Sequence, residues 1–344
     1  MTVEIESDLF RSCNSASSVK ELQRLLDDIN LDGRHQLKLA DPTILETTFY
    51  NSLSLLDQEI LAGSFEISNN ESIQTECFIC KDGAKYCSEP KYSIDEGHVY
   101  LTSPVTVWVE NSQNDSRFIK ALMRHFCPEI PFDDWYFHGW LVFENSGGCS
   151  NAINAINEEL NRFQGKTKML RCFVLLDGDK TCPTDNVTKY DSFIGFCNQN
   201  GITCHVLTKR SMENYMPDAV FDEFRSNTTD SWIDAYLYLS PEQKDFYNIA
   251  EGFNANIRDK QLRNQGHRGR IYMNPVVQQF YSSVSDINYD YLEQGLSISN
   301  FKAEFPKKFE QSPSVFATSL LQRTCHQANP NELYEIVNQI VKLF

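Results

Sequence analysis

Four acidic residues follow three apolar segments of this sequence, each near the point where a segment ends. Glu110 comes directly after VTVWV, and Asp177 and Asp179 come directly after RCFVLL. Glu213 follows the segment ITCHVL after a short linker. If these segments are strands of a parallel sheet, their carboxyl ends share one edge, where ligands and catalytic groups gather. We therefore expect the four carboxylates to converge.

Clustered carboxylates repel one another, and a divalent cation with hard oxygen ligands, Mg²⁺ or Mn²⁺, neutralises them. Such a cation holds phosphate oxygens and activates water, so the predicted chemistry is phosphoryl transfer with one or two metal ions. Asp177 and Asp179 point the same way if the backbone is extended, and Gly178 permits a sharp turn. Lys209 and Arg210, after the last segment, are predicted to stabilise charge at the catalytic site.

Hydrophobic periodicity predicts the elements that must position these residues. From residue 104 to 235, short apolar runs alternate with amphipathic helical patterns. This alternation is typical of a mostly parallel sheet with helices on both faces. The predicted strands are 105–109, 135–143, 171–176 and 202–207. The predicted fold class is therefore α/β.

Two regions flank this central domain. Residues 1–103 begin with a helical pattern over 19–29 and become strand-like over 75–100, which predicts an α+β region. Residues 236–344 are predicted to be mainly helical. The sequence shows no internal repeat.

The composition limits the classes of protein. The chain has 31 Lys+Arg and 47 Asp+Glu, a net charge of −16, which argues against a protein that coats nucleic acid by bulk charge. It has no apolar run long enough to span a membrane and no basic-then-apolar signal segment. Its 11 cysteines are scattered and odd in number, as expected for free thiols. These features predict a cytoplasmic protein without a membrane partner.

The ordered motifs resemble the TOPRIM domain, which has a glutamate after the first strand, a glycine turn after the second and Asp-x-Asp after the third. Glu110, Gly147-Gly148 and the Asp-Gly-Asp motif match these positions. The stretch HVLTKRSMENYMPD (205–218) resembles the [KR]xxENY segment of OLD-type nucleases and of stand-alone TOPRIM proteins in prokaryotic anti-phage defence systems. The resemblance covers roughly residues 104–225.

The resemblance implies a metal-dependent endonuclease that cleaves DNA or RNA, transfer RNA included. Glu110 would bind metal or act as general base, Asp177 and Asp179 would hold the metal, and Glu213 would complete a second metal site. It also implies a toxic effector, and the acidic net charge fits an effector that a regulatory protein partner restrains until it is triggered. The sequence contains no G-x-x-x-x-G-K-[ST] loop, so a regulating ATPase is expected on a separate chain.

Two positions depart from the family pattern V-E-G-x-x-D. This sequence reads VENSQND, with Asn111 in place of the glycine and Asp115 one position later than usual. Asp115 is therefore either a ligand or a cap of the helix that follows. These departures keep an alternative open, a non-catalytic binding or sensor subunit on the same scaffold.

A second alternative comes from the run Asp177-Gly178-Asp179-Lys180-Thr181, which also fits the D-x-D-x-T motif of haloacid-dehalogenase-like phosphatases. There the first aspartate is a nucleophile and the second a general acid. The later acidic pair of that family would be Asp286 and Asp290. No apolar strand precedes Asp286, and Glu110 would have no role, so we prefer the nuclease interpretation.

One basic segment, 258–270, contrasts with the acidic background and is predicted to contact phosphates of nucleic acid. Its predicted binding residues are Arg258, Lys260, Arg263, His267, Arg268 and Arg270. Lys302, Lys307 and Lys308 would extend this basic surface if the C-terminal helices fold over the site.

The cysteines provide one further metal hypothesis. Cys77, Cys80 and Cys87, together with His98, are zinc-type donors. Their spacing matches no zinc ribbon, and ECFICKDGAKYC is also typical of a half-buried hairpin. We prefer the hairpin.

Overall fold

The protein divides into two compact units. The structure is a computed structural model that describes residues 1–30, 33–68, 74–81, 90–147, 149–256 and 273–344. Unit 1 consists of Met1–Val105, Glu158–Arg171 and Val341–Phe344, and unit 2 consists of Thr106–Asn157 and Cys172–Ile340. The boundary predicted at residue 103 lies beside the first division. No division falls near residue 235, so the helical C-terminal region belongs to unit 2.

Unit 1 is built on a four-stranded parallel sheet with the order β2-β1-β3-β4. Its short strands are β1 (Thr2–Ile5), β2 (Gln36–Lys38), β3 (Cys77–Ile79) and β4 (Lys91–Tyr92). Its helices are α1 (Ser7–Arg11), α2 (Ala16–Asn30), η2 (Pro42–Glu46), α3 (Thr48–Ser52), α4 (Leu55–Ser68), α5 (Ile94–Thr102) and η4 (Thr167–Met169). The predicted helix over 19–29 lies within α2, and its Leu22, Leu25 and Ile29 are buried in the core of the unit.

Two predictions for unit 1 are wrong. β3 and β4 pair in parallel, so Cys77 does not begin a hairpin. The second half of the predicted strand-like stretch is helix α5, which begins with a capping box. The Ser93 side chain accepts from the Glu96 N–H, and the Glu96 carboxylate accepts from the Ser93 N–H. All described strands of unit 1 pair in parallel, and helices connect β1 to β2 and β2 to β3, so unit 1 is α/β rather than α+β.

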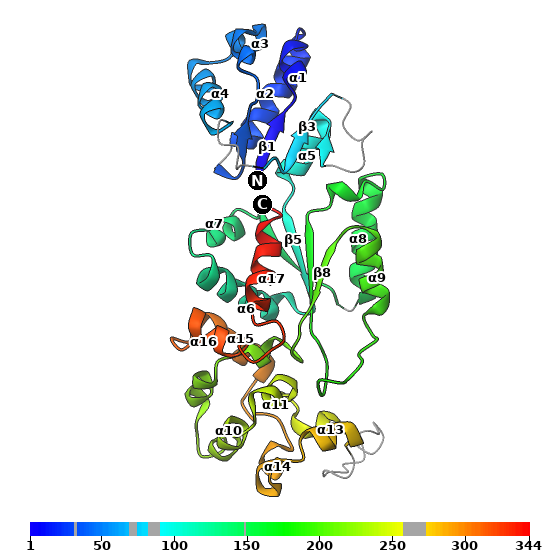
Figure 1. Ribbon diagram of the computed structural model, residues 1–344, viewed down its shortest axis with the longest axis vertical. Coiled ribbons are helices and arrows are strands. Elements are labelled where there is room, and N and C mark those ends of the chain that lie inside the picture. Colours follow the sequence, from blue (N-terminus) through cyan, green and yellow to red (C-terminus); the bar gives the residue numbers. More distant parts are fainter. Residues whose placement is uncertain (31–32, 69–73, 82–89, 148, 257–272) are drawn as a thin grey trace. The chain divides into compact units, whose positions relative to one another are not determined.

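Unit 2 is built on a second four-stranded parallel sheet, with the order β6-β5-β7-β8. Its strands are β5 (Val105–Val109), β6 (Leu141–Asn145), β7 (Cys172–Leu176) and β8 (Thr203–Val206). The helices after β5 are α6 (Ser112–Phe126), α7 (Phe132–Phe137), α8 (Cys149–Arg162) and α9 (Asp191–Gln199). Figure 1 shows α8 and α9 on one side of this sheet and α6 on the other.

The rest of unit 2 is helical, as predicted. It contains η5 (Met212–Tyr215), η6 (Asp218–Phe224), α10 (Asp230–Leu237), α11 (Pro241–Phe246), η7 (Gly252–Asn256), α13 (Pro275–Phe280), α14 (Asp286–Leu292), α15 (Phe301–Gln311), α16 (Ala317–Gln322) and α17 (Glu332–Val341). Among these, α15 packs along α6, where Phe309 contacts Phe118 at a ring-centroid distance of 5.2 Å. This packing brings a C-terminal helix beside the segment that follows β5.

The apolar runs predict three of the four strands of unit 2 well. All five residues of β7 are buried, as expected for a central strand covered on both faces. The predicted strand over 135–143 is half wrong, because its first residues belong to α7 and only its end enters β6. The aromatic residues of WYFHGWLVF fit either structure, so composition alone does not separate them.

The two sheets share one topology. In each, the strand that comes second in the chain lies at one edge, followed across the sheet by the first, third and fourth strands. The sequence shows no repeat, so this topological repeat appears only in the structure.

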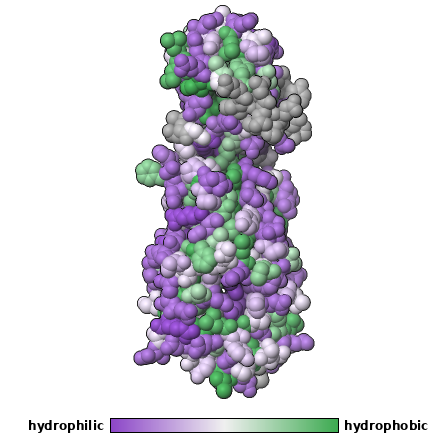
Figure 2. All heavy atoms as spheres, turned by 60° about the vertical axis from the view of Figure 1, so that its left-hand side comes forward, coloured by the Kyte–Doolittle hydropathy of each residue, from purple (hydrophilic) through white to green (hydrophobic). Residues whose placement is uncertain are grey.

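Hydrophilic residues predominate on the face shown in Figure 2, and apolar residues there form small groups. In the part of the chain that the structure describes, no helix is both long and apolar enough to cross a membrane.

Candidate active site

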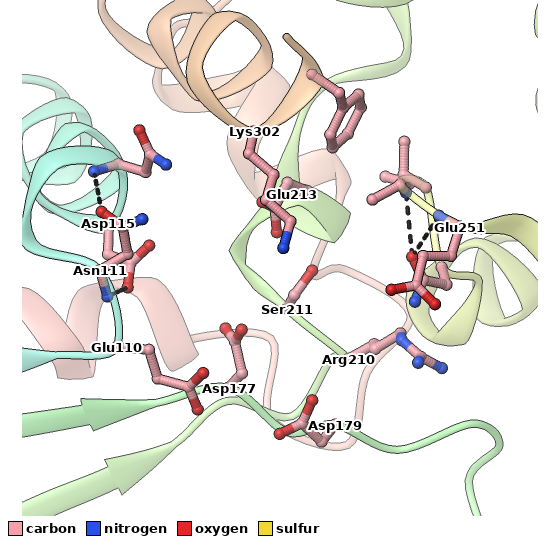
Figure 3. A pocket seen from close by; sticks show the side chains of 15 residues that line it. Glu110, Asn111, Asp115, Asp177, Asp179, Arg210, Ser211, Glu213, Glu251 and Lys302 are labelled. Atoms are coloured by element: carbon pink, nitrogen blue, oxygen red, sulfur yellow. Dashed lines mark hydrogen bonds between the residues drawn. The ribbon is translucent and has the colours of Figure 1, made fainter. Parts of the chain in front are cut away.

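A cavity of about 270 Å³ lies in unit 2, where β5, β7 and β8 end. Six acidic residues line it, namely Glu110, Asp115, Asp177, Asp179, Glu213 and Glu251. The structure thus brings together the four carboxylates named from the sequence and adds two more. In Figure 3, Glu110, Asp177 and Asp179 extend from the ends of neighbouring strands, whereas Glu251 lies apart on another segment.

The Asp-Gly-Asp turn is shaped by a close backbone approach. A Cβ on Gly178 would lie 2.2 Å from the Lys209 carbonyl oxygen and 2.5 Å from that of Leu207, so only glycine fits. The Asp179 N–H then donates to the Arg210 carbonyl over 2.7 Å. Asp179 has a φ of 52°, so the backbone is not extended as predicted. Both aspartates nevertheless line the cavity.

Two residues that the sequence analysis missed hold Glu110 and Asp179. The Tyr190 hydroxyl lies within hydrogen-bond distance of a carboxylate oxygen of each. The Lys189 ammonium pairs with Asp179 and lies 4.0 Å from Glu110. Both belong to the long connection between β7 and α9, a segment without hydrophobic periodicity that could have drawn attention to them.

Asn111 and Asp115 both contribute hydrogen bonds to the start of α6. Asn111 is the N-cap, and its side chain accepts from the N–H groups of Gln113 and Asn114. Asp115 is buried in the first turn and accepts from the Asn111 N–H over 2.7 Å. Burial raises the pKa of Asp115 to about 8, and the charges of Glu213 and Glu110 act in the same direction.

Asp177 is surrounded by other carboxylates of the cavity. Burial and the neighbouring carboxylates, Glu213 and Glu110 first among them, raise its pKa well above the usual value for aspartate. It accepts one hydrogen bond, from the Met212 N–H over 3.3 Å. A bound cation would relieve this repulsion.

The Glu-Asn-Tyr motif forms η5, and its three residues have different roles. Glu213 lines the cavity. Asn214 is buried and donates to the carbonyls of Lys244 and Tyr247 over 2.7 and 2.8 Å. The Tyr215 hydroxyl donates to Glu332 over 2.5 Å. Asn214 and Tyr215 therefore anchor the turn that presents Glu213.

Glu332, at the start of α17, forms hydrogen bonds with residues along the segment from β8 to η5. It is fully buried and accepts from the Thr208 N–H over 2.8 Å as well as from Tyr215, and it contacts His205 over 3.0 Å. These hydrogen bonds hold the pKa of Glu332 below its usual value against the opposing effect of burial. No sequence motif marked this residue, which lies more than 100 positions from its partners.

The prediction that Lys209 stabilises charge at the catalytic site is not supported by its position. Lys209 is fully buried, and its ammonium pairs with Asp245 and donates to the Arg323 carbonyl rather than facing the cavity. Arg210 does line the cavity. In Figure 3 its guanidinium group is directed away from Asp177.

Lys302 is the second cation of the cavity. It extends from α15 toward Glu213 and is exposed. Lys307 lines a neighbouring cavity, and Lys308 pairs with Glu223 over 2.8 Å. The predicted nucleic-acid-binding set Arg258, Lys260, Arg263, His267, Arg268 and Arg270 lies outside the described residues, so its position remains a prediction.

The donor chemistry of the cavity fits a hard divalent cation. Its carboxylates are oxygen ligands, and burial, together with the charges of neighbouring carboxylates, raises the pKa values of Asp115 and Asp177. Among the described residues, no three His, Cys, Asp or Glu side chains are already arranged to hold a metal ion.

The other two hypotheses from the sequence find little support. Asp286 and Asp290 lie on α14 and do not line the cavity with Asp177, as a haloacid-dehalogenase-like site would require. Cys77 and Cys80 are buried free cysteines, and Cys87 lies outside the described residues. His98 pairs with Asp28 instead of facing them.

Comparison with known proteins adds no relative: no family model, no curated protein and no solved structure matches the chain.

Proposed function

We propose that this protein is a metal-dependent nuclease with a TOPRIM-like site that cleaves phosphodiester bonds of nucleic acid. The observation that carries the proposal is the convergence of Glu110, Asp177, Asp179 and Glu213 on one cavity, from segments up to 103 residues apart in the chain. Concentrated negative charge of this kind is costly, and metal-dependent phosphoryl transfer is a chemistry that uses it.

In this proposal Glu110, Asp177, Asp179 and Glu213 hold Mg²⁺ or Mn²⁺. When bound, such a metal supplies charge neutralisation at the scissile phosphate and lowers the pKa of a bound water. Tyr190 fixes the orientation of Glu110 and Asp179 through its hydroxyl. Lys302 lies where it can bind a phosphate oxygen, the role that the sequence analysis gave to Lys209.

The resemblance of the sequence to TOPRIM effectors extends the proposal to a biological setting. The protein would act on DNA or RNA as the toxic component of a prokaryotic anti-phage defence system, under the control of a protein partner. Co-purification with the products of neighbouring genes tests this part. A chain that is active and harmless on its own would contradict it.

The test of the activity is a cleavage assay with plasmid DNA, single-stranded DNA, messenger RNA and transfer RNA, in Mg²⁺, Mn²⁺ or EDTA. We expect cleavage of at least one substrate that requires metal and is lost in Asp177→Asn. Asp290→Asn is the matched control, because Asp290 is exposed on α14 and matters only to the phosphatase alternative. Cleavage unchanged in Asp177→Asn would refute the site. Absence of cleavage on every substrate would favour the non-catalytic binding subunit.

A further inference from the structure

A second cavity, of about 560 Å³, adjoins the acidic one. Asn114 lines both, so the two cavities share a wall at the start of α6. The second cavity is formed by α6, α15, the end of α7 and β6. We call it the α6–α15 groove. Unlike the acidic cavity, it carries three cations, which are Arg117, Lys120 and Lys307.

The three cations differ in their availability. Arg117 pairs with Glu310 over 2.5 Å, and Lys307 pairs with Glu304 over 2.6 Å. Lys120 has no carboxylate partner in the part of the chain that the structure describes. Its ammonium instead lies over the ring of Tyr136, 3.7 Å from the centroid. Lys120 is therefore the cation most available to an incoming anion.

Two aromatic rings stand beside this lysine. Tyr136 and Phe143 line the groove with their ring centroids 6.0 Å apart. Tyr136 is 46% exposed. An exposed aromatic ring next to a cation is the combination with which proteins bind single-stranded nucleic acid, because bases stack on the ring while the cation contacts the backbone.

We propose that the α6–α15 groove binds a single-stranded stretch of nucleic acid next to the bond that is cleaved. This inference rests on the proposed nuclease function and specifies its substrate class. Lys120 and Arg117 would contact phosphates, and a base would stack on Tyr136. Only an unpaired base exposes its face to a side chain, which is why the groove selects single strands over duplex. On a chain of net charge −16, a local cationic groove also determines where a polyanion can bind.

The experiment measures binding of fluorescent 12-nucleotide probes to the full chain by anisotropy in EDTA, where metal-dependent cleavage is absent. The probes are single-stranded DNA, single-stranded RNA and a duplex of the same sequence. Lys120→Ala and Tyr136→Ala are the test variants. Lys20→Ala and Tyr238→Ala are the matched controls, since both residues are exposed and neither lines the groove.

We expect each test variant to weaken binding of the preferred single strand about 5- to 10-fold, the scale of one lost stacking or phosphate contact, and each control less than 2-fold. Tyr136→Phe keeps the ring and should bind like the wild type. Lys120→Ala should also reduce the dependence of affinity on salt, which Tyr136→Ala should leave unchanged. The tighter of the DNA and RNA probes identifies the sugar of the substrate.

The inference is overturned if the test variants bind as their controls do, or if the duplex binds more tightly than both single strands. Failure of the nuclease proposal is a separate result, because it appears as absence of metal-dependent cleavage and leaves the binding measured in EDTA unaffected.

Discussion

Unit 1 and unit 2 have sheets of the same strand order, yet different residues follow equivalent strands. Glu6 follows β1 and Glu110 follows β5, but the third strand is followed by buried Cys80 in unit 1 and by Asp177 in unit 2. The Glu6 carboxylate accepts from the Lys81 N–H. The shared topology provides an edge in both units, and among the described residues the carboxylates of unit 2 line a cavity at that edge.

Charged side chains have different surroundings at Arg171 in unit 1 and at the acidic cavity of unit 2. In unit 1, Arg171 is buried and donates to the carbonyls of Tyr100, Ser103 and Leu343, so backbone dipoles satisfy the cation. In unit 2, burial and the neighbouring carboxylates Glu213 and Glu110 together raise the pKa of Asp177. Backbone carbonyls thus satisfy the buried Arg171 of unit 1, whereas in unit 2 the carboxylates Glu110, Asp177, Asp179 and Glu213 line one cavity.

The largest expected effect tests this difference directly. Glu110→Gln or Asp177→Asn should lower the cleavage rate by a factor of about 1,000, equivalent to about 4 kcal/mol, because each removes a charge from the proposed metal site. Glu6→Gln, at the equivalent strand end of unit 1, should leave the rate unchanged. If Glu6→Gln and Glu110→Gln lowered the cleavage rate equally, the proposal that the catalytic site lies in unit 2 would be contradicted.

Substitution of one glycine in each unit should change the free energy of unfolding by different amounts. Gly178→Ala should lower the free energy of unfolding of unit 2 by about 3 kcal/mol or more, since the new Cβ would meet backbone carbonyls. Gly97→Ala in unit 1 should cost less, because its Cβ would meet the end of the flexible Ile79 side chain at 2.5 Å. Gly195→Ala is the control, with nothing within 4 Å. Urea unfolding measures all three.

The two units should respond to pH with opposite signs. Burial lowers the pKa of His35 in unit 1 to about 3, so the unfolded chain binds a proton that the native unit lacks between about pH 6.5 and 3. Stability of unit 1 then falls on acidification, by at most about 1.4 kcal/mol per pH unit for this group. The pKa of Asp115 in unit 2 is raised to about 8, so the native unit retains a proton and loses stability as the pH rises from about 4 to 8.

The pH dependence of each unit's stability can be measured separately, because the four tryptophans of the chain all belong to unit 2. They are Trp108, Trp135, Trp140 and Trp232. Tryptophan fluorescence therefore follows unit 2, while far-UV circular dichroism follows both units. In EDTA, Asp115→Asn should reduce the pH dependence seen by fluorescence, and Asp177, whose pKa is also raised, should maintain the remainder. His35→Gln should reduce the additional loss seen by circular dichroism in acid. The same pH slope in wild type and variant would contradict the assignment for that unit.

The smallest expected effect on cleavage concerns Glu332, whose hydrogen bonds hold the segment that carries Glu213. Glu332→Gln should lower cleavage about 5- to 10-fold and raise the Mg²⁺ concentration needed for half-maximal rate. Thr208 and Tyr215 donate to different oxygens of the Glu332 carboxylate, and a glutamine side chain has one oxygen, so one of the two hydrogen bonds is lost. Glu335→Gln, exposed on the same helix, is the control. A loss of stability with an unchanged Mg²⁺ requirement would show that Glu332 supports the fold alone.

Local patterns predicted the elements that carry the site but only part of the site itself. The apolar runs before Glu110 and Asp177 are strands β5 and β7, because a continuous buried run has few other structures available. Asp115 remained ambiguous, since its burial depends on how the first turn of α6 meets the sheet. Tyr190 and Glu332 were missed because their contacts join segments far apart in the chain.

The sequence by itself determined the α/β class of the central domain, three of its four strands and the four carboxylates that follow them, since these depend on hydrophobic periodicity and on residue order. The tertiary structure decided the rest. It buried Lys209 against Asp245, placed Lys302 in the cavity instead, and gave both units one strand order that the sequence conceals. The physical reason is that the burial, ion pairing and pKa of a side chain depend on which distant segments pack against it. The neighbouring residues in the sequence do not determine that packing.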